Sequence, residues 1–175
     1  MDRTGQGHVC HSYTKIVGVT HRNPDGSDRQ ILIQKCSLLD RLDLDHEQDN
    51  PHDPNAVRVL RGTGEQLGYL QAEVAADIVS KSERGYRFEV FITDISGDEQ
   101  NGQSLGVKLL VIQADPGIED GPVKNYLKQL IATDPELEWA NTESMGPGCL
   151  IALALIVASW VIIYFMIIYF IIMRR

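Results

Sequence analysis

Cysteine is scarce in this 175-residue sequence, and the cysteines present are poorly placed for cross-linking. There are three, at Cys10, Cys36 and Cys149. An odd number without clustered spacing does not describe a disulfide framework. The chain is therefore expected to work in a reducing compartment.

Positive charge is also in short supply. Sixteen Lys and Arg residues face 24 Asp and Glu residues, which gives a formal net charge of −8. Non-specific affinity for nucleic acid comes mostly from neutralising phosphates with Lys and Arg. With this composition the chain is expected to be a poor generic polyanion binder.

Signals for export and for catalysis are missing as well. Residues 1–13 are polar and rich in Gly and His, whereas a signal peptide needs a basic start and an apolar run. There is no Gly-x-Ser-x-Gly elbow, and the glycine-rich stretch 62–68 lacks the Lys-Ser/Thr of a P-loop. No nucleophile and base pair is apparent, so we expect no enzymatic activity.

Two stretches have metal-capable residues but fail the patterns of metal sites. Residues 43–49 carry acids at alternate positions, yet Gln48 and Pro54 stand where a calcium loop needs Gly and Glu. The prediction there is a solvated acidic loop. His8, Cys10 and His11 lack a second ligand pair at zinc-site spacing. No metal or cofactor is expected.

One long apolar run stands near the end of the sequence. Residues 150–173 contain no charged residue, Pro or Gly, and 24 helical residues span about 36 Å, more than the hydrocarbon core of about 30 Å. We predict a transmembrane helix over residues 149–173. With no export signal before it and only Arg174 and Arg175 after it, the layout is typical of a single-pass, tail-anchored protein whose soluble domain faces the cytoplasm.

Short apolar runs separated by turn residues predict a mainly β fold with one or two helices. Five or six strands and an amphipathic helix at 71–82 suggest a small, partly open β-barrel of the SH3-like or OB-like kind. The predicted strands are 15–20, 29–36, 56–61, 66–70, 88–93 and 105–111, with a hairpin turn at 23–26. The predicted domain organisation is a disordered tail 1–13, a β-barrel 14–113, an acidic stalk 114–148 with a short helix at 123–131, the transmembrane helix 149–173 and a basic tail 174–175.

The most specific local pattern is Asn-Pro-His-Asp-Pro-Asn-Ala-Val-Arg-Val at residues 50–59. Its two X-Pro steps favour a rigid extended turn that feeds a strand and presents His52 and Asp53 at its rim. Gln-Leu-Gly-Tyr-Leu follows at 66–70, then the predicted helix, and Val-Gly-Val stands upstream at 17–19. Together these features resemble the HIRAN domain over about residues 14–113.

The resemblance implies a small β-barrel that holds the 3′ end of single-stranded DNA, as in the accessory modules of helicase-like repair translocases. It places Asp53 at the contact to the terminal hydroxyl, and His52 where relatives carry a Tyr able to stack on a base. Thr20 and Ala72 stand where the DNA-binding members have Arg and Lys, so two phosphate-contacting cations are missing. The candidate ligand-binding residues are Asn50, His52, Asp53, Tyr69, His21 and Arg58.

Two functions stay open at this point. The first is a membrane-tethered binding module for single-stranded DNA or another nucleic acid, and the second is an adaptor whose acidic surface selects a basic protein partner. The same motif also has a purely structural interpretation, in which Asn50, Asp53 and Asn55 only build the turn. A basic rim made by Arg22, Arg58 and Arg61 would favour nucleic acid.

Overall fold

The structure, a computed structural model, describes residues 7–97, 101–134 and 137. These residues belong to one compact unit. Within the described part of the chain, no helix combines the length and the apolar character needed to cross a membrane. The predicted span at 149–173 lies outside the described residues.

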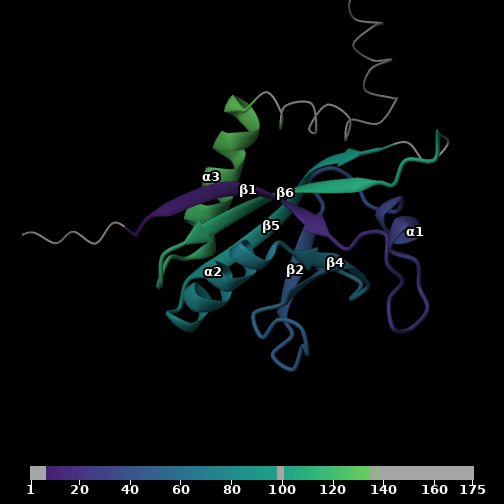
Figure 1. Cartoon of the computed structure of the whole chain (residues 1–175). Helices are drawn as coiled ribbons and strands as arrows, with labels where there is room; N and C mark the ends of the chain where they lie inside the picture. The colour runs from purple at the N-terminus through teal and green to yellow at the C-terminus, as the bar shows by residue number, and fades with distance from the viewer. Residues whose placement is uncertain (1–6, 98–100, 135–136, 138–175) are drawn as a thin grey trace, which may run out of the picture. The chain divides into compact units, whose positions relative to one another are not determined.

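Six antiparallel strands form a barrel in the order β1-β4-β3-β2-β5-β6 (Figure 1). The predicted mainly β fold is confirmed, but the prediction of a partly open barrel is wrong. The sheet closes because β1 changes partner along its length: Val9–Lys15 pairs with β6, and Ile16 and Val17 pair with β4. The strands are β1 (Val9–Val17), β2 (Arg41–His46), β3 (Val57–Arg61), β4 (Gln66–Leu70), β5 (Arg87–Ser96) and β6 (Gly106–Ala114).

The barrel interior holds the main apolar core, into which helix α2 (Ala72–Glu83) packs Ala75, Ile78 and Val79. The predicted helix at 71–82 is thereby confirmed. It ends in a Schellman motif, since the N–H groups of Gly85 and Tyr86 donate to the carbonyl oxygens of Ser82 and Lys81. Gly85 takes the left-handed conformation that this motif requires, at φ 85°.

Two of the sequence-based predictions for single elements are wrong. Residues 29–36, predicted as a strand, begin with helix α1 (Arg29–Ile33), because the Asp28 side chain caps it by accepting from the Gln30 N–H at 2.9 Å. Residues 43–46, predicted as part of an acidic loop, belong to β2. The acids alternate there because Leu42 and Leu44 point into the core while their strand neighbours point outward.

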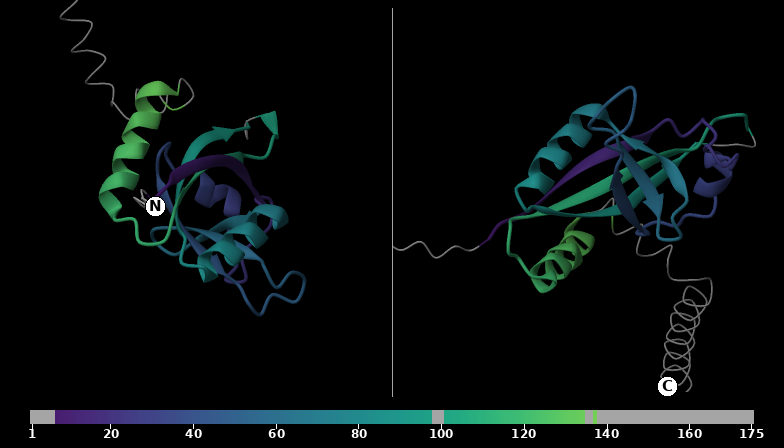
Figure 2. Two further views of the ribbon diagram at one scale, coloured as in Figure 1. Left: turned by 90° about the vertical axis from the view of Figure 1, so that its left-hand side faces the viewer. Right: turned by 90° about the horizontal axis from the view of Figure 1, so that it is seen from below.

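The predicted domain limits also need correction at both ends. Residues 9–13 are part of β1 instead of a disordered tail. Helix α3 (Asp120–Thr133) replaces much of the predicted stalk, and it packs against the outside of β1 and β6. Figures 1 and 2 show α3 on the opposite side of the barrel from α2.

The contact beneath α3 is apolar. Strand pairing aligns Tyr13 of β1, Leu110 of β6 and Phe91 of β5 on the outer face, and we call this set the apolar row. Leu110 is fully buried there, in a cluster that includes Val123 of α3. The helix therefore completes the domain by covering apolar side chains that the barrel would otherwise expose.

Candidate functional site

A second set of residues lies side by side on the outside of the barrel, and its chemistry is polar. Strand pairing places Asp45 of β2, Arg58 of β3 and Tyr69 of β4 next to one another, and we call this set the polar row. Arg58 donates to the Asp45 carboxylate, and this hydrogen bond is the main cause that raises the pKa of Arg58. The positive charge of Arg58 is thus already engaged within the protein.

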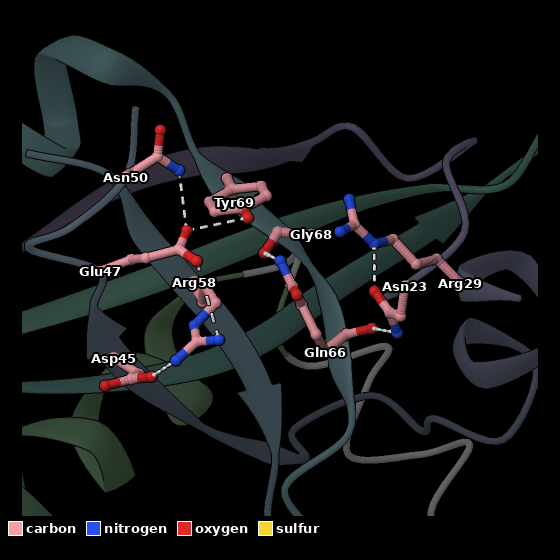
Figure 3. Close-up of polar contacts among 9 residues, drawn as sticks. All are labelled: Asn23, Arg29, Asp45, Glu47, Asn50, Arg58, Gln66, Gly68 and Tyr69. Carbon is pink, nitrogen blue, oxygen red and sulfur yellow. Dashed lines mark hydrogen bonds and ion pairs between the residues drawn. The ribbon is translucent and has the colours of Figure 1, made fainter. Parts of the chain in front are cut away.

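Glu47, directly after β2, joins the polar row to the loop that follows it (Figure 3). Its Oε2 accepts from the Asn50 amide at 2.8 Å and from the Tyr69 hydroxyl at 3.0 Å, and its Oε1 lies 3.9 Å from Arg58 Nη1. The Asn50 hydrogen bond lowers the pKa of Glu47, with smaller contributions from the Tyr69 bond and the Arg58 charge. The ionised carboxylate therefore fixes the position of the Tyr69 ring.

The loop at 50–55 is held by its own side chains. Asn50 Oδ1 accepts from the backbone N–H groups of His52 at 2.9 Å and Asp53 at 3.2 Å, and Asp53 Oδ1 accepts from the Asn55 N–H at 2.8 Å. Asn50 and Asp53 thus do build the turn, as the structural interpretation of the motif holds. Asp53 Oδ2 has no hydrogen-bond partner among the described residues, and the His52 side chain is exposed. The loop is therefore held by several hydrogen bonds, while His52 is exposed and Asp53 is partly exposed.

On the other side of Tyr69 lies Arg29, the first residue of α1 (Figure 3). Its guanidinium carbon stands 5.4 Å from the centre of the Tyr69 ring, within the range of a cation–π contact. Arg29 Nε donates to Asn23 Oδ1 at 2.6 Å and Nη1 donates to the Gly18 carbonyl oxygen at 2.9 Å. Asn23 is fixed in turn, because its amide donates to the Gln66 carbonyl oxygen at 2.8 Å.

The structure brings most of the predicted site residues together. Asn50, Tyr69 and Arg58 meet at Glu47, and His52 and Asp53 belong to the adjoining loop. His21 forms no hydrogen bond to them within the described residues and is exposed, on the turn that its N–H closes by donating to the Gly18 carbonyl oxygen.

The three arginines considered for a basic rim are all paired with carboxylates. Arg22 lies 3.6 Å from Asp28, and Arg61 pairs with Glu65 just as Arg58 pairs with Asp45. The outside of the site therefore offers little free positive charge.

Sequence reasoning missed Glu47 and Arg29 as site residues. Glu47 was assigned to a solvated acidic loop. The alternation of Leu42 and Leu44 before it predicts a strand instead, and that strand would place Glu47 at the edge of the barrel. Arg29 fell inside a supposed strand, and no local pattern indicates its burial. Within the described residues, no three His, Cys, Asp or Glu side chains are placed to share a metal ion.

Comparison with known proteins gives one family match. The sequence fits the family model described as HIRAN domain over residues 9–110. Similar solved structures include the HIRAN domain of human HLTF, with a TM-score of 0.45 and 15% identity over 74% of this chain and 88% of that chain. A protein from Lactobacillus plantarum has a TM-score of 0.46 and 19% identity over 61% of this chain and 97% of its own. No curated protein matches the sequence.

Proposed function

The chain belongs to the HIRAN domain family, and on this basis we propose that it is a non-enzymatic module that binds the end of a single-stranded nucleic acid. The observation that carries the proposal is the Tyr69 ring, held by Glu47 and flanked by Arg29, next to a hydrogen-bonded loop that exposes His52. Stacking of a base on an aromatic ring contributes about 1–3 kcal/mol. A ring already fixed in place loses little rotamer freedom when a base stacks on it.

The acidic groups around the ring favour a free hydroxyl over a phosphate at the strand end. A sugar hydroxyl can donate a hydrogen bond to a carboxylate, and Asp53 Oδ2 has no partner among the described residues. A terminal phosphate would instead meet the negative charges of Asp53 and Glu47. This supports the role that the family resemblance gives to Asp53.

Because the arginines near the site are paired with carboxylates, we expect added salt to weaken nucleic-acid binding only modestly. Each neutralised phosphate contributes about −0.7 to the logarithmic salt slope for a single strand. With Arg22, Arg58 and Arg61 engaged by carboxylates, we expect a slope near −1 instead of the steep values of basic proteins.

The direct test is fluorescence anisotropy with short labelled oligonucleotides and the full chain in detergent micelles. We expect saturable binding at low salt and weaker binding when the 3′-hydroxyl is replaced by a 3′-phosphate. Asp53→Ala should remove this preference. Asp43→Ala, which removes an outward-facing acid of β2, is the matched control and should keep it. Absence of saturable binding would refute the proposal and favour the adaptor for a basic protein partner.

We also propose that residues 149–173 hold the chain in a membrane with the domain facing the cytoplasm. The support is the length and apolar character of residues 150–173. The protein should stay in the membrane pellet after carbonate extraction, and protease added to intact cells should leave the domain uncut. Recovery in the soluble fraction would contradict the anchor, and cleavage in unbroken cells would contradict the orientation.

A further inference from the structure

Arg29 carries a buried positive charge that the protein leaves without a carboxylate. The residue is 4% exposed. None of the ion pairs between described residues includes it, although eight others are formed. Removing an arginine from water costs several kcal/mol, and buried charges are normally paired. An arginine in this position is therefore expected to bind an anion.

The partners that Arg29 does have orient it without neutralising it. The Asn23 side-chain oxygen, the Gly18 carbonyl oxygen and the Tyr69 ring are all uncharged. They fix the plane of the guanidinium, which is the group best suited to grip a phosphate with two parallel N–H bonds. The fork is therefore preorganised before any ligand arrives.

Part of the Arg29 fork remains available for such a ligand. Nε donates its N–H to Asn23 and Nη1 donates one of its two N–H groups to Gly18, so the second N–H of Nη1 and both N–H groups of Nη2 have no hydrogen bond among the described residues. In the described part of the chain, Arg58 Nε is the one side-chain nitrogen or oxygen that is both buried and without a hydrogen-bond partner. Because Nη2 of Arg29 also has no partner, it must be accessible to solvent.

Gly18 leaves room beside this group. A Cβ at position 18 would lie 3.2 Å from Arg29 Nη1 and 3.5 Å from His21 Cδ2. A larger residue there would crowd the guanidinium, and its φ of +70° also favours glycine. Arg29 and His21 thus both lie beside a position that carries no side chain.

We propose that Arg29 forms an anion subsite that binds one phosphodiester of the strand, adjacent to the nucleotide that stacks on Tyr69. This inference rests on the proposed nucleic-acid function. The subsite supplies a cation from inside the domain, whereas Thr20 and Ala72 supply none at the surface positions. It requires a single phosphate at a defined distance from the strand end.

A backbone scan of the ligand tests the subsite without altering the protein. Single methylphosphonate linkages, which remove one negative charge, are placed in turn along an oligonucleotide with a free 3′-hydroxyl and titrated against the full chain. We expect one linkage near the 3′ end to weaken binding about tenfold or more, about 1.4 kcal/mol per factor of ten, and the other linkages to weaken it less than threefold. Equal effects at every linkage, or no effect at any, would overturn the subsite.

Variants then assign the sensitive linkage to Arg29. In Arg29→Gln, oligonucleotides with a neutral or a charged linkage at the sensitive position should bind with equal affinity. Arg29→Lys keeps the positive charge but loses the planar guanidinium, so part of the difference in affinity should remain. Arg61→Gln is the control, because Arg61 is already paired with Glu65, and it should preserve the whole difference. If Arg29→Gln does not fold, the Arg29→Lys result and the scan on the unaltered chain still decide.

Inorganic phosphate separates the failure of this inference from the failure of the proposed function. We expect it to compete with the oligonucleotide in the unaltered chain and to compete less in Arg29→Lys. If phosphate shifts the Gly18 amide signal in NMR spectra but no oligonucleotide binds, the proposed function fails and the site takes a free anion. If oligonucleotides bind with no sensitive linkage, the proposed function stands and the Arg29 subsite fails.

Discussion

The polar row and the apolar row lie on the outside of the same barrel, yet they are completed in opposite ways. The apolar row is covered by α3 and leaves Leu110 without exposed surface. At the polar row, Arg29 of helix α1 contacts the Tyr69 ring, and the side chains of the row are held by Arg58 and Glu47 while remaining partly exposed. The apolar row contributes to stability and needs no ligand. In the polar row, hydrogen bonds fix the positions of groups that face solvent. This contrast is why we propose the ligand-binding site at the polar row.

The largest effect should come from a cavity beneath α3. Leu110→Ala removes a fully buried side chain from the apolar row, and such changes cost about 2–5 kcal/mol of unfolding free energy. Urea unfolding followed by circular dichroism measures this loss. Oligonucleotide affinity per folded molecule should not change, because the site lies on other strands. A cost below about 1 kcal/mol would mean that α3 does not seal the row.

A glycine next to the polar row should show the next largest effect. A Cβ at Gly68 would lie 2.4 Å from the Val17 carbonyl oxygen and 2.5 Å from Ile16 Cγ2, so Gly68→Ala forces β1 and β4 apart. Such overpacking costs about 1–3 kcal/mol. Unlike Leu110→Ala, this change should weaken binding too, because it displaces the adjacent Tyr69.

The matched control for this substitution is Gly62→Ala. Nothing lies within 4 Å of a Cβ at Gly62, and its φ is not positive. We expect a stability change within about 0.5 kcal/mol. Equal effects of the two substitutions would contradict the close approach of β1 and β4.

Sequence patterns predicted the strands and helix whose apolar periodicity is regular. Strand β3 and helix α2 were found because one face of each is buried and the other is not. Helix α1 was missed because its five residues are too few to show a helical period, and the consecutive Ile31, Leu32 and Ile33 are as typical of a strand.

The packing of α3 against the barrel could have been predicted from an apolar run in β6. Residues 109–112 are all apolar, whereas a strand with one wet face alternates, so both faces of β6 had to be covered. No comparable run predicts the position of Arg29. Arg29 is buried because Asn23, Gly18 and Tyr69 surround it in the folded barrel, and no periodic pattern along the chain predicts that these residues come together.

Removing the charge of Glu47 should have a moderate effect confined to the polar row. Glu47→Gln keeps the size of the side chain but weakens the hydrogen bonds that Asn50 and Tyr69 donate to it. Hydrogen bonds to charged groups contribute about 1.5–3 kcal/mol, so a loss of about 1 kcal/mol is expected because the amide can still accept one of them. Oligonucleotide binding should weaken as the Tyr69 ring is released. Asp43→Asn, in β2 but outside this network, should leave both stability and binding unchanged.

The smallest effect, a pH dependence, separates the two rows most cleanly. The Asn50 hydrogen bond, and after it the Tyr69 bond and the Arg58 charge, lower the pKa of Glu47 in the folded protein. A carboxyl with a lowered folded pKa stabilises the fold above its ordinary value of about 4.5, and this contribution is lost as the pH falls through the folded value. The difference in unfolding free energy between the unaltered chain and Glu47→Gln should therefore be complete at about pH 6 to 7 and shrink below about pH 4.5. The deficit of Leu110→Ala should stay constant over the same range, because no titrating group causes it. Urea unfolding at a series of pH values tests both statements, and a Glu47→Gln deficit that persists in acid would show that Glu47 acts through packing instead of charge.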